Sequence, residues 1–85
     1  MNIKDTSIDE EQMKTIYLRI GQNVKKIRQS KNISQLQLAL AIGHKAVGTI
    51  SVCELGTNGK HFNIEHLFKI ADVLEVDVDD FFKGI

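Results

Sequence analysis

Apolar residues recur every three or four positions in the first third of the chain, which predicts an amphipathic helix. These positions are Met13, Ile16, Tyr17, Ile20, Val24 and Ile27. Their spacing places them on one face of a helix that runs as far as Lys31. Ser7-Ile8-Asp9-Glu10 has the spacing of a capping box, so the helix is predicted to begin near Ile8. Residues 1–7 are then a flexible tail, and Gly21 is a position where the helix could bend or be interrupted.

A short helix is predicted immediately after Ser34. The Ser34 hydroxyl can cap a helix from about Gln35 to Ile42, a run rich in residues with high helix propensity. Gly43 then occupies the place where a helix commonly ends in a left-handed residue, a conformation that glycine adopts without steric cost. The chain is therefore expected to turn sharply at Gly43.

A second short helix is predicted from about Val47 to Leu55, with Gly56 ending it. Ile50 and Cys53 are three residues apart and are expected to face the core. Two short helices joined by a tight turn cannot bury both apolar faces alone, so they require flanking helices. The segment 34–56 is therefore the predicted helix-turn-helix core of a larger helical domain.

Two further helices are predicted near the C-terminus. Asn63 can cap a fourth helix, and Asp77 can cap a fifth. The buried face of the fourth helix is expected to hold Ile64, Leu67, Phe68, Ala71 and Leu74, and the apolar positions of the fifth helix are Val78, Phe81 and Phe82. The expected fold is a single all-α domain of five helices over residues 8–85, with the first helix extended at its N-terminal end.

Several short motifs, in this order and spacing, resemble the lambda-repressor/Cro-type (XRE) helix-turn-helix family. The matching residues are Ser34-Gln35, Leu38-Ala39, Gly43, Thr49-Ile50-Ser51 and Glu54-Leu55-Gly56. Residues 67–82 are similar to the last two helices of that family. The resemblance covers about residues 20–82 and implies a lambda-repressor-like DNA-binding domain. The family typically inserts its third helix into the major groove of double-stranded DNA.

The chain departs from the family pattern beside the expected DNA-facing surface. The interval from Gly43 to Ile50 is longer than usual by a residue. The stretch 57–62 is also longer than usual and lacks the common proline. Both departures bear on which side chains contact bases, and neither changes the expected fold.

The resemblance implies a set of DNA-contacting residues. In and before the third helix these are His44, Lys45, Ala46, Val47, Thr49 and Ser51. Lys45 could address guanine or phosphate, and Ala46 or Val47 could contact a thymine methyl group. Gln35 is expected to reach the DNA backbone or an outer base, and Asn58, Lys60 and His61 are phosphate candidates in the following loop. Arg28 and Glu54 resemble the family's internal ion pair.

The distribution of charge favours a polyanionic partner more than the formal net charge of zero does. Residues 22–61 carry six basic residues and one acidic residue. Residues 62–85 carry two basic and six acidic residues, and residues 1–21 three basic and four acidic. The basic block coincides with the helix-turn-helix, where phosphate contacts would be needed. A block of charge can also serve only to keep a surface hydrated, so its position is the informative feature.

Composition bounds the remaining functions. A chain of 85 residues forms a core that is marginal for stability, so a homodimer is expected. The dimer surface is either the N-terminal extension, whose alternative is to pack on the same core, or Phe81, Phe82 and Ile85, whose alternative is to complete the core. No apolar run is long enough to span a bilayer and the charged start lacks a signal sequence, so a cytoplasmic, nucleoid-associated protein is expected. The single cysteine, Cys53, is expected to be a structural thiol.

The favoured hypothesis is a repressor-like transcriptional regulator that binds a palindromic operator as a dimer. No catalytic residues, metal ligands, cofactor or small-molecule substrate are predicted. The only nucleophile-and-base combinations pair a histidine with Cys53, which is expected to face the core. Cys53 and the three histidines also lack the short paired spacing that is typical of a metal site. The alternatives are a protein-interaction module of the same fold without DNA binding, and an antitoxin or restriction-modification controller subunit. No residue distinguishes a repressor from an activator.

Overall fold

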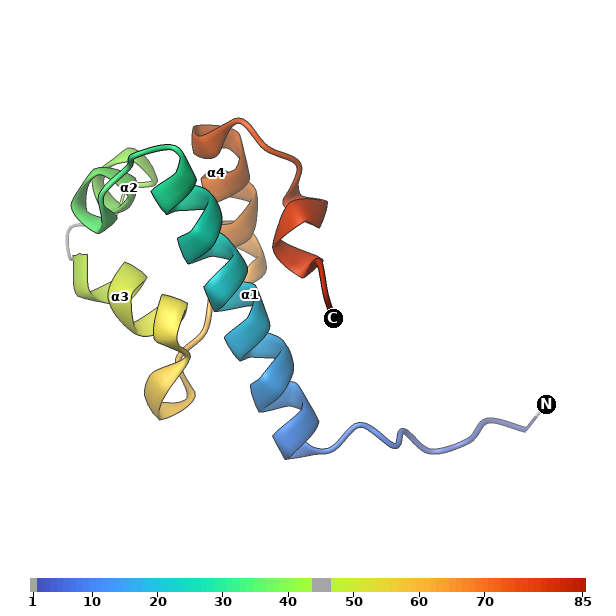
Figure 1. Cartoon of the computed structure of the whole chain (residues 1–85). Helices are drawn as coiled ribbons and strands as arrows, with labels where there is room; N and C mark the ends of the chain where they lie inside the picture. The colour runs from blue at the N-terminus through green and yellow to red at the C-terminus, as the bar shows by residue number, and fades with distance from the viewer. Residues whose placement is uncertain (1, 44–46) are drawn as a thin grey trace.

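The computed structural model describes residues 2–43 and 47–85, which form four α-helices and two short 3-10 helices (Figure 1). In chain order these are α1 (Glu10–Ser30), α2 (Gln35–Ala41), α3 (Val47–Leu55), η1 (Thr57–Gly59), α4 (Ile64–Leu74) and η2 (Val78–Phe82). Helix α1 crosses the molecule, with α2 and α3 at one side of it and α4 and η2 at the other (Figure 1). None of the described helices is long and apolar enough to cross a membrane.

Helix α1 begins two residues later than the sequence predicts, because Asp9 and not Ser7 caps it. The Asp9 carboxylate accepts the Gln12 amide at 2.8 Å, and Gln12 Oε1 accepts the Asp9 amide at 2.8 Å. These two bonds form a complete capping box. The Ile8 amide donates instead to Thr6 Oγ1, so the chain before Asp9 is held by a separate local bond.

Gly21 does not interrupt α1, which runs unbroken from Glu10 to Ser30. Its missing side chain serves packing instead. A Cβ atom at Gly21 would lie 2.5 Å from the carbonyl oxygen of Glu54 and 2.6 Å from that of Cys53. Because both atoms belong to the backbone of α3, only glycine lets α1 and the end of α3 approach this closely.

The core lies where the apolar faces of the four α-helices meet, and η2 closes one side of it. Its buried apolar members are Ile20, Val24, Leu38, Ala39, Ile42, Ile50, Cys53, Phe62, Leu67, Ile70, Ala71, Leu74 and Phe81. Every helix predicted from periodicity contributes to this cluster. Burial of the cluster supplies the main driving force for folding.

Two of the predicted core residues of α4 are wrong. Ile64 is 67% exposed and Phe68 is 59% exposed, whereas Leu67, Ala71 and Leu74 are buried as predicted. The buried stripe of α4 is completed by Ile70. The chain after α4 packs η2 against α1 and α4, so it leaves the side of α4 that carries Ile64 and Phe68 uncovered.

The predicted fifth α-helix is instead the 3-10 helix η2, so the prediction of five α-helices is wrong. Asp77 occupies the residue before it but its side chain makes no capping bond. Asn23 on α1 fixes the segment from the other side, because its amide nitrogen donates to the carbonyl oxygens of Phe81 and Lys83 at 2.9 Å each. Phe81 is fully buried, while Phe82 is 41% exposed. One phenylalanine therefore completes the core and its neighbour remains at the surface.

Candidate nucleic-acid interface

The turn between α2 and α3 follows from local sequence. Ser34 Oγ accepts the Gln37 amide at 3.0 Å, and Gln37 Oε1 accepts the Ser34 amide at 2.8 Å, which forms a capping box at the start of α2. At the other end Gly43 has a φ of +88°, in the left-handed region. A side chain at that φ would be strained, so glycine sets the direction in which the chain leaves α2.

Helix α3 buries one face and presents an uncharged, small-residue surface on the other. Ile50 and Cys53 are buried, as their spacing predicts. Val47 and Gly48 are exposed at the start of the helix, and Thr49, Ser51 and Val52 are half-buried beside them. The face available to a groove of DNA therefore combines methyl groups with two hydroxyls, and the first charged residue of α3 is the buried Glu54.

A buried polar network connects the end of α1 with the end of α3. Arg28 Nε donates to Glu54 Oε2 at 2.7 Å and Arg28 Nη2 donates to Glu54 Oε1 at 3.0 Å. The remaining guanidinium nitrogen, Nη1, donates to the carbonyl oxygen of Ile33 at 2.8 Å. This is a bidentate ion pair, in which planar donor and acceptor groups match in geometry. Both side chains are almost fully buried.

Gln35 joins this network, a role that the sequence analysis did not predict. Its amide nitrogen Nε2 donates to Glu54 Oε1 at 2.9 Å. The start of α2 is thereby tied to the end of α3, and both are tied to α1 through Arg28. The network fixes the angle between the two helices of the motif, which is the geometry that a DNA groove would meet.

Lys60 lies next to the first turns of α3, although it comes five residues after the end of that helix. It lines a groove of about 390 Å³ together with Gly48, Thr49, Val52, Cys53, His61 and His66. Gly56, with a φ of +66°, and the single turn η1 reverse the chain so that Lys60 returns to the helix. The structure therefore brings together three residues predicted to contact DNA, namely Thr49, Lys60 and His61, along with Gly48.

His61, a phosphate candidate, is held against α1. Its ring stacks on that of Tyr17 with centroids 3.6 Å apart and an interplanar angle of 5°. His66 also has an internal partner, because its Nδ1 accepts a hydrogen bond from the Asn63 amide at 3.1 Å in the capping box of α4. Among residues 2–43 and 47–85, no group of three or more His, Cys, Asp or Glu side chains is placed to hold a metal ion.

Cys53 has the environment of a structural thiol. Burial raises the pKa of its thiol above the ordinary value of 9.0, and the positive charge of Lys60 opposes that rise. Burial dominates, because charged sulfur is poorly solvated in the core. The thiolate is the nucleophilic form of cysteine, so the raised pKa lowers the fraction of Cys53 that is in the reactive form at neutral pH.

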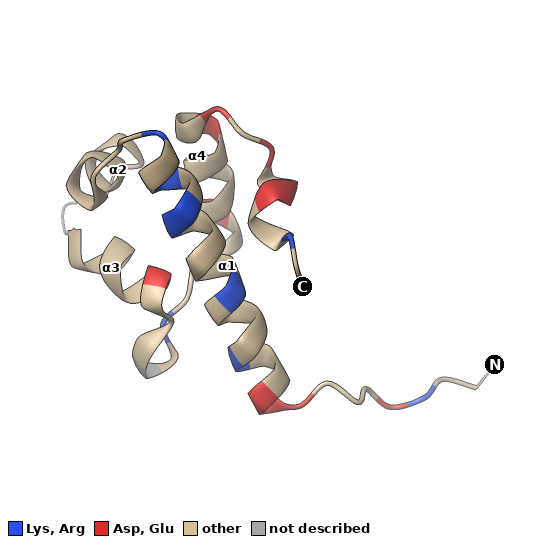
Figure 2. Ribbon diagram, in the orientation of Figure 1, with Lys and Arg blue, Asp and Glu red and all other residues tan. Residues whose placement is uncertain are grey.

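The structure divides the basic block that the sequence places around the motif. Basic residues gather along α1, whereas acidic residues gather along α4, η2 and the segment between them (Figure 2). Lys26 and Lys31 line a groove with Asp80 and Lys83, on the side of α1 that faces η2. These two lysines therefore lie near the acidic C-terminal segment, in a groove that includes no residue of α3.

Some of the predicted DNA contacts fall outside the described part of the chain. These are His44, Lys45, Ala46 and the side chain of Asn58. Of the others, Val47, Thr49 and Ser51 share α3, and Lys60 lies next to it. Gln35 has an internal partner.

Two short helices meeting at a glycine turn, braced by flanking helices, define the helix-turn-helix class of DNA-binding domain. The chain belongs to the XRE-type helix-turn-helix family of Cro and lambda-repressor-type regulators, since the family model described as helix-turn-helix matches residues 24–81. The resemblance inferred from the motifs is thus confirmed. No curated protein and no solved structure matches the chain.

Proposed function

We propose that the protein is a transcriptional repressor that binds a palindromic operator as a homodimer, with α3 of each subunit in the major groove. Repression follows from occupancy of a promoter, and such a regulator would act at the nucleoid in the cytoplasm. The observation that supports this proposal is the exposed start of α3 with Lys60 beside it. The half-sites are expected about one helical turn of DNA apart, because each major groove faces the same side once per turn.

The chemistry of α3 predicts how the bases are distinguished. The described surface offers the methyl groups of Val47, Thr49 and Val52 and the hydroxyls of Thr49 and Ser51. It offers no long side chain able to form two hydrogen bonds to guanine. Contacts to thymine methyl groups are therefore expected to be prominent at the bases facing Val47 and Thr49, while Lys60 contacts phosphate.

Selection of bound duplexes from a random pool at fixed salt tests the proposal. A palindromic consensus would support a dimeric repressor and report the half-site spacing. The apparent affinity should fall steeply with rising salt, because each neutralised phosphate releases counterions. Absence of binding to any duplex at low salt would overturn DNA binding itself.

Variants of Lys60 and Thr49 sharpen the test. Lys60→Ala should weaken binding to all duplexes and reduce the salt slope by about one, if Lys60 contacts a phosphate. Thr49→Ala should relax the preference at one base pair, at a cost of about 1–3 kcal/mol in discrimination. Lys69→Ala is the matched control, because Lys69 is an exposed lysine on α4 that forms only a surface ion pair with Glu65. Equal effects of Lys60→Ala and Lys69→Ala would remove Lys60 from the interface.

A protein-interaction module with the same fold is the second candidate. Two observations favour it: Lys26 and Lys31 lie away from α3, and α2 and α4 expose Leu36, Leu40, Ile64 and Phe68. An antitoxin or a restriction-modification controller subunit would combine binding to another protein with DNA binding. Absence of binding to any duplex at low salt, together with capture of a protein partner through α4, would favour the module without DNA binding.

A further inference from the structure

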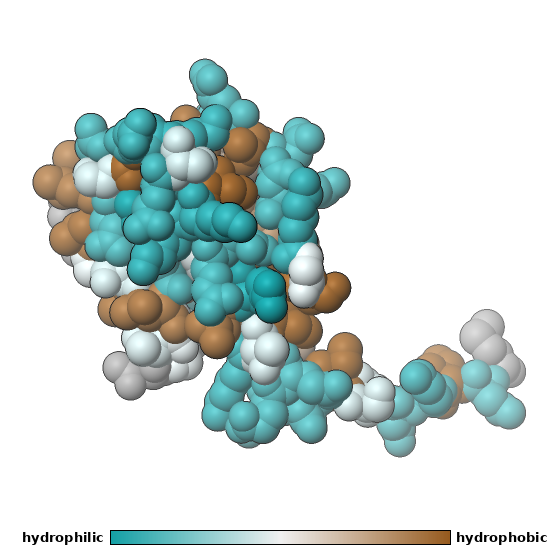
Figure 3. Space-filling model, in the orientation of Figure 1, coloured by the Kyte–Doolittle hydropathy of each residue, from teal (hydrophilic) through white to brown (hydrophobic). Residues whose placement is uncertain are grey.

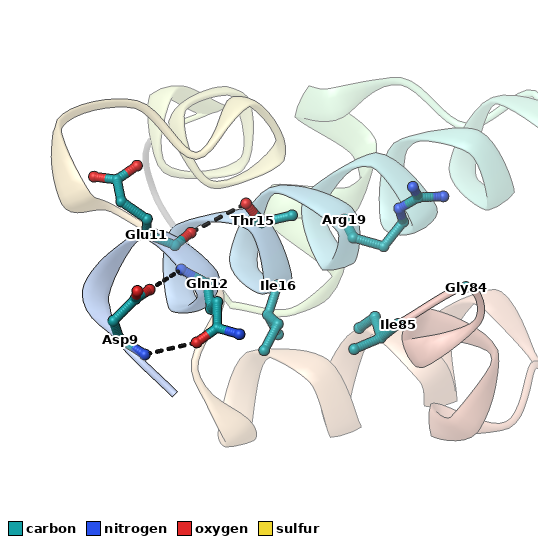
Figure 4. A pocket seen from close by; sticks show the side chains of 8 residues that line it. All are labelled: Asp9, Glu11, Gln12, Thr15, Ile16, Arg19, Gly84 and Ile85. Atoms are coloured by element: carbon teal, nitrogen blue, oxygen red, sulfur yellow. Dashed lines mark hydrogen bonds between the residues drawn. The ribbon is translucent and has the colours of Figure 1, made fainter. Parts of the chain in front are cut away.

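A groove runs between the N-terminal half of α1 and the end of the chain, on a side of the molecule that the DNA proposal does not use. It has a volume of about 500 Å³ and is lined by Asp9, Glu11, Gln12, Thr15, Ile16, Arg19, Gly84 and Ile85. Ile16 and Ile85 face it from opposite walls, as Figure 4 shows. Ile85 is 56% exposed, so the groove has an apolar floor open to solvent.

The apolar surface continues beyond this groove. A second hollow of about 360 Å³ shares Ile16 and is lined mainly by apolar residues of α1, α4 and η2, among them Met13, Ile64 and Phe82. Ile64 lies on the side of α4 that η2 leaves uncovered, and Phe82 is the exposed last residue of η2 itself. The two hollows together make a continuous apolar face of the kind that marks an interaction site.

The charges at the two ends of the first groove are opposite in sign. Glu11 lies at one end and Arg19 at the other (Figure 4), two turns of helix or about 12 Å apart along α1. Arg19 forms no ion pair with any residue in the described ranges. Glu11 has only a 3.4 Å contact with Lys14, and both side chains are largely exposed. Pairs of this kind contribute little to stability, so both charges remain available.

This arrangement is self-complementary under a two-fold axis. If two copies of α1 pack antiparallel with Thr15 at the axis, Glu11 of each copy lies opposite Arg19 of the other. A two-fold interface uses the same surface on both subunits and repeats each contact twice. Thr15 is small enough to permit close approach, and its hydroxyl already donates to the carbonyl oxygen of Glu11 at 3.0 Å. Ile16 and Ile85 would then be buried on both sides of the axis.

We infer that this face joins two copies of the chain, with α1 packed antiparallel on α1 and Glu11 paired with Arg19 across the interface. The inference deepens the dimer in the proposed function and rests on it for its biological role. It concerns association in the absence of DNA, so its test does not depend on operator binding.

Sedimentation equilibrium of the whole chain without DNA tests this inference through a charge exchange. Each single reversal, Arg19→Glu or Glu11→Lys, should raise the dimer dissociation constant by on the order of tenfold, because it places like charges opposite each other twice. The double variant should restore the dissociation constant to within about threefold of the parent, because the pair is re-formed in the opposite sense. Restoration distinguishes pairing across an interface from a general loss of stability.

The matched control exchanges charges on another helix. Glu65 and Lys69 form an exposed i,i+4 pair on α4, with nitrogen and oxygen 3.2 Å apart. Glu65→Lys and Lys69→Glu should leave the dissociation constant unchanged. A monomer at every concentration, a dimer insensitive to both single reversals, or a double variant that does not recover would each overturn the inference. Dissociation of the control variants instead would place the interface on α4 and overturn it as well.

Discussion

The two halves of α1 carry the same apolar periodicity but are stabilised in different ways. In the C-terminal half, Ile20, Gly21, Val24 and Arg28 are buried. In the N-terminal half, Met13, Ile16 and Tyr17 are only half-buried and their helix turns project past the rest of the bundle (Figure 1). The match to the helix-turn-helix family begins at residue 24, so it includes only part of the buried half.

The difference teaches that periodicity predicts a helix but not how much of its face is covered. The C-terminal half lies against α3 and η2, which supply the covering atoms. The N-terminal half has its capping box, the stacking of Tyr17 on His61 and the partial packing of Ile16 on the core, and it borders the groove. Figure 3 shows one face of the molecule, on which hydrophilic atoms predominate and apolar atoms lie at the left edge and in a band below the middle.

The largest expected effect comes from breaking the buried ion pair of the C-terminal half. Arg28→Ala should lower the free energy of unfolding by about 3–5 kcal/mol, because it leaves the Glu54 carboxylate buried without its bidentate partner. Guanidinium chloride denaturation measures this loss. Lys14→Ala in the N-terminal half is the control and should cost at most about 0.5 kcal/mol, since Lys14 and its partner are exposed. Equal losses would remove the contrast between the halves.

Gly21→Ala should also destabilise the fold, by about 1–3 kcal/mol, because the added methyl group would meet the backbone of α3. This outcome opposes helix propensity, which favours alanine over glycine by about 1 kcal/mol. Gly48→Ala in α3 is the matched control, because a Cβ there has nothing within 4 Å. The control should leave stability unchanged or raise it by about 0.5–1 kcal/mol. Thermal denaturation of both variants followed by circular dichroism checks the prediction, and a more stable Gly21→Ala variant would contradict the close approach.

Asp9→Ala should cost about 1 kcal/mol, through loss of the cap that starts the N-terminal half. Ser7→Ala should leave the free energy of unfolding unchanged, because Ser7 lies before the cap that the structure identifies. Amide hydrogen exchange of the first turn of α1 would locate the effect. A larger loss of unfolding free energy with Ser7→Ala than with Asp9→Ala would contradict the observed cap and support the helix start near Ile8 that the sequence predicts.

The smallest expected effect concerns the thiol of Cys53, the residue whose carbonyl oxygen lies close to Gly21. Its raised pKa means that alkylation should begin only at a pH above that of a free thiol, and the rate should stay low at neutral pH. Because the unfolded state loses this proton first, the free energy of unfolding should fall as the pH rises above 9.0 toward the pKa of the folded state. Alkylation followed by mass spectrometry over a pH series measures the first effect. A rate equal to that of a free thiol would show that Cys53 is accessible.

The sequence predicts well the features that depend on near neighbours. Ser34, Asn63, Gly43 and Gly56 have the capping or left-handed roles expected of them. The sequence predicts poorly the features that depend on which element packs against a given helix face. Phe68 matches the periodicity of α4 yet remains exposed, because periodicity does not say where the covering chain passes.

The candidate site divides in the same way. The motif and the bounds of α3 follow from the sequence, because caps, glycine turns and apolar spacing are encoded within a few residues. The bond from Gln35 to Glu54, the return of Lys60 to α3 and the separation of Lys26 and Lys31 from it are visible only in three dimensions.

By itself the sequence determined the class of fold, the family and the order of its helices, since local hydrogen bonds and the burial of regular apolar stripes decide these. Only the tertiary structure decided which faces remained open, which polar groups became partners and how closely two helices could approach at Gly21. The physical reason is that these depend on atoms far apart in the chain, whose positions follow from the packing of the whole core.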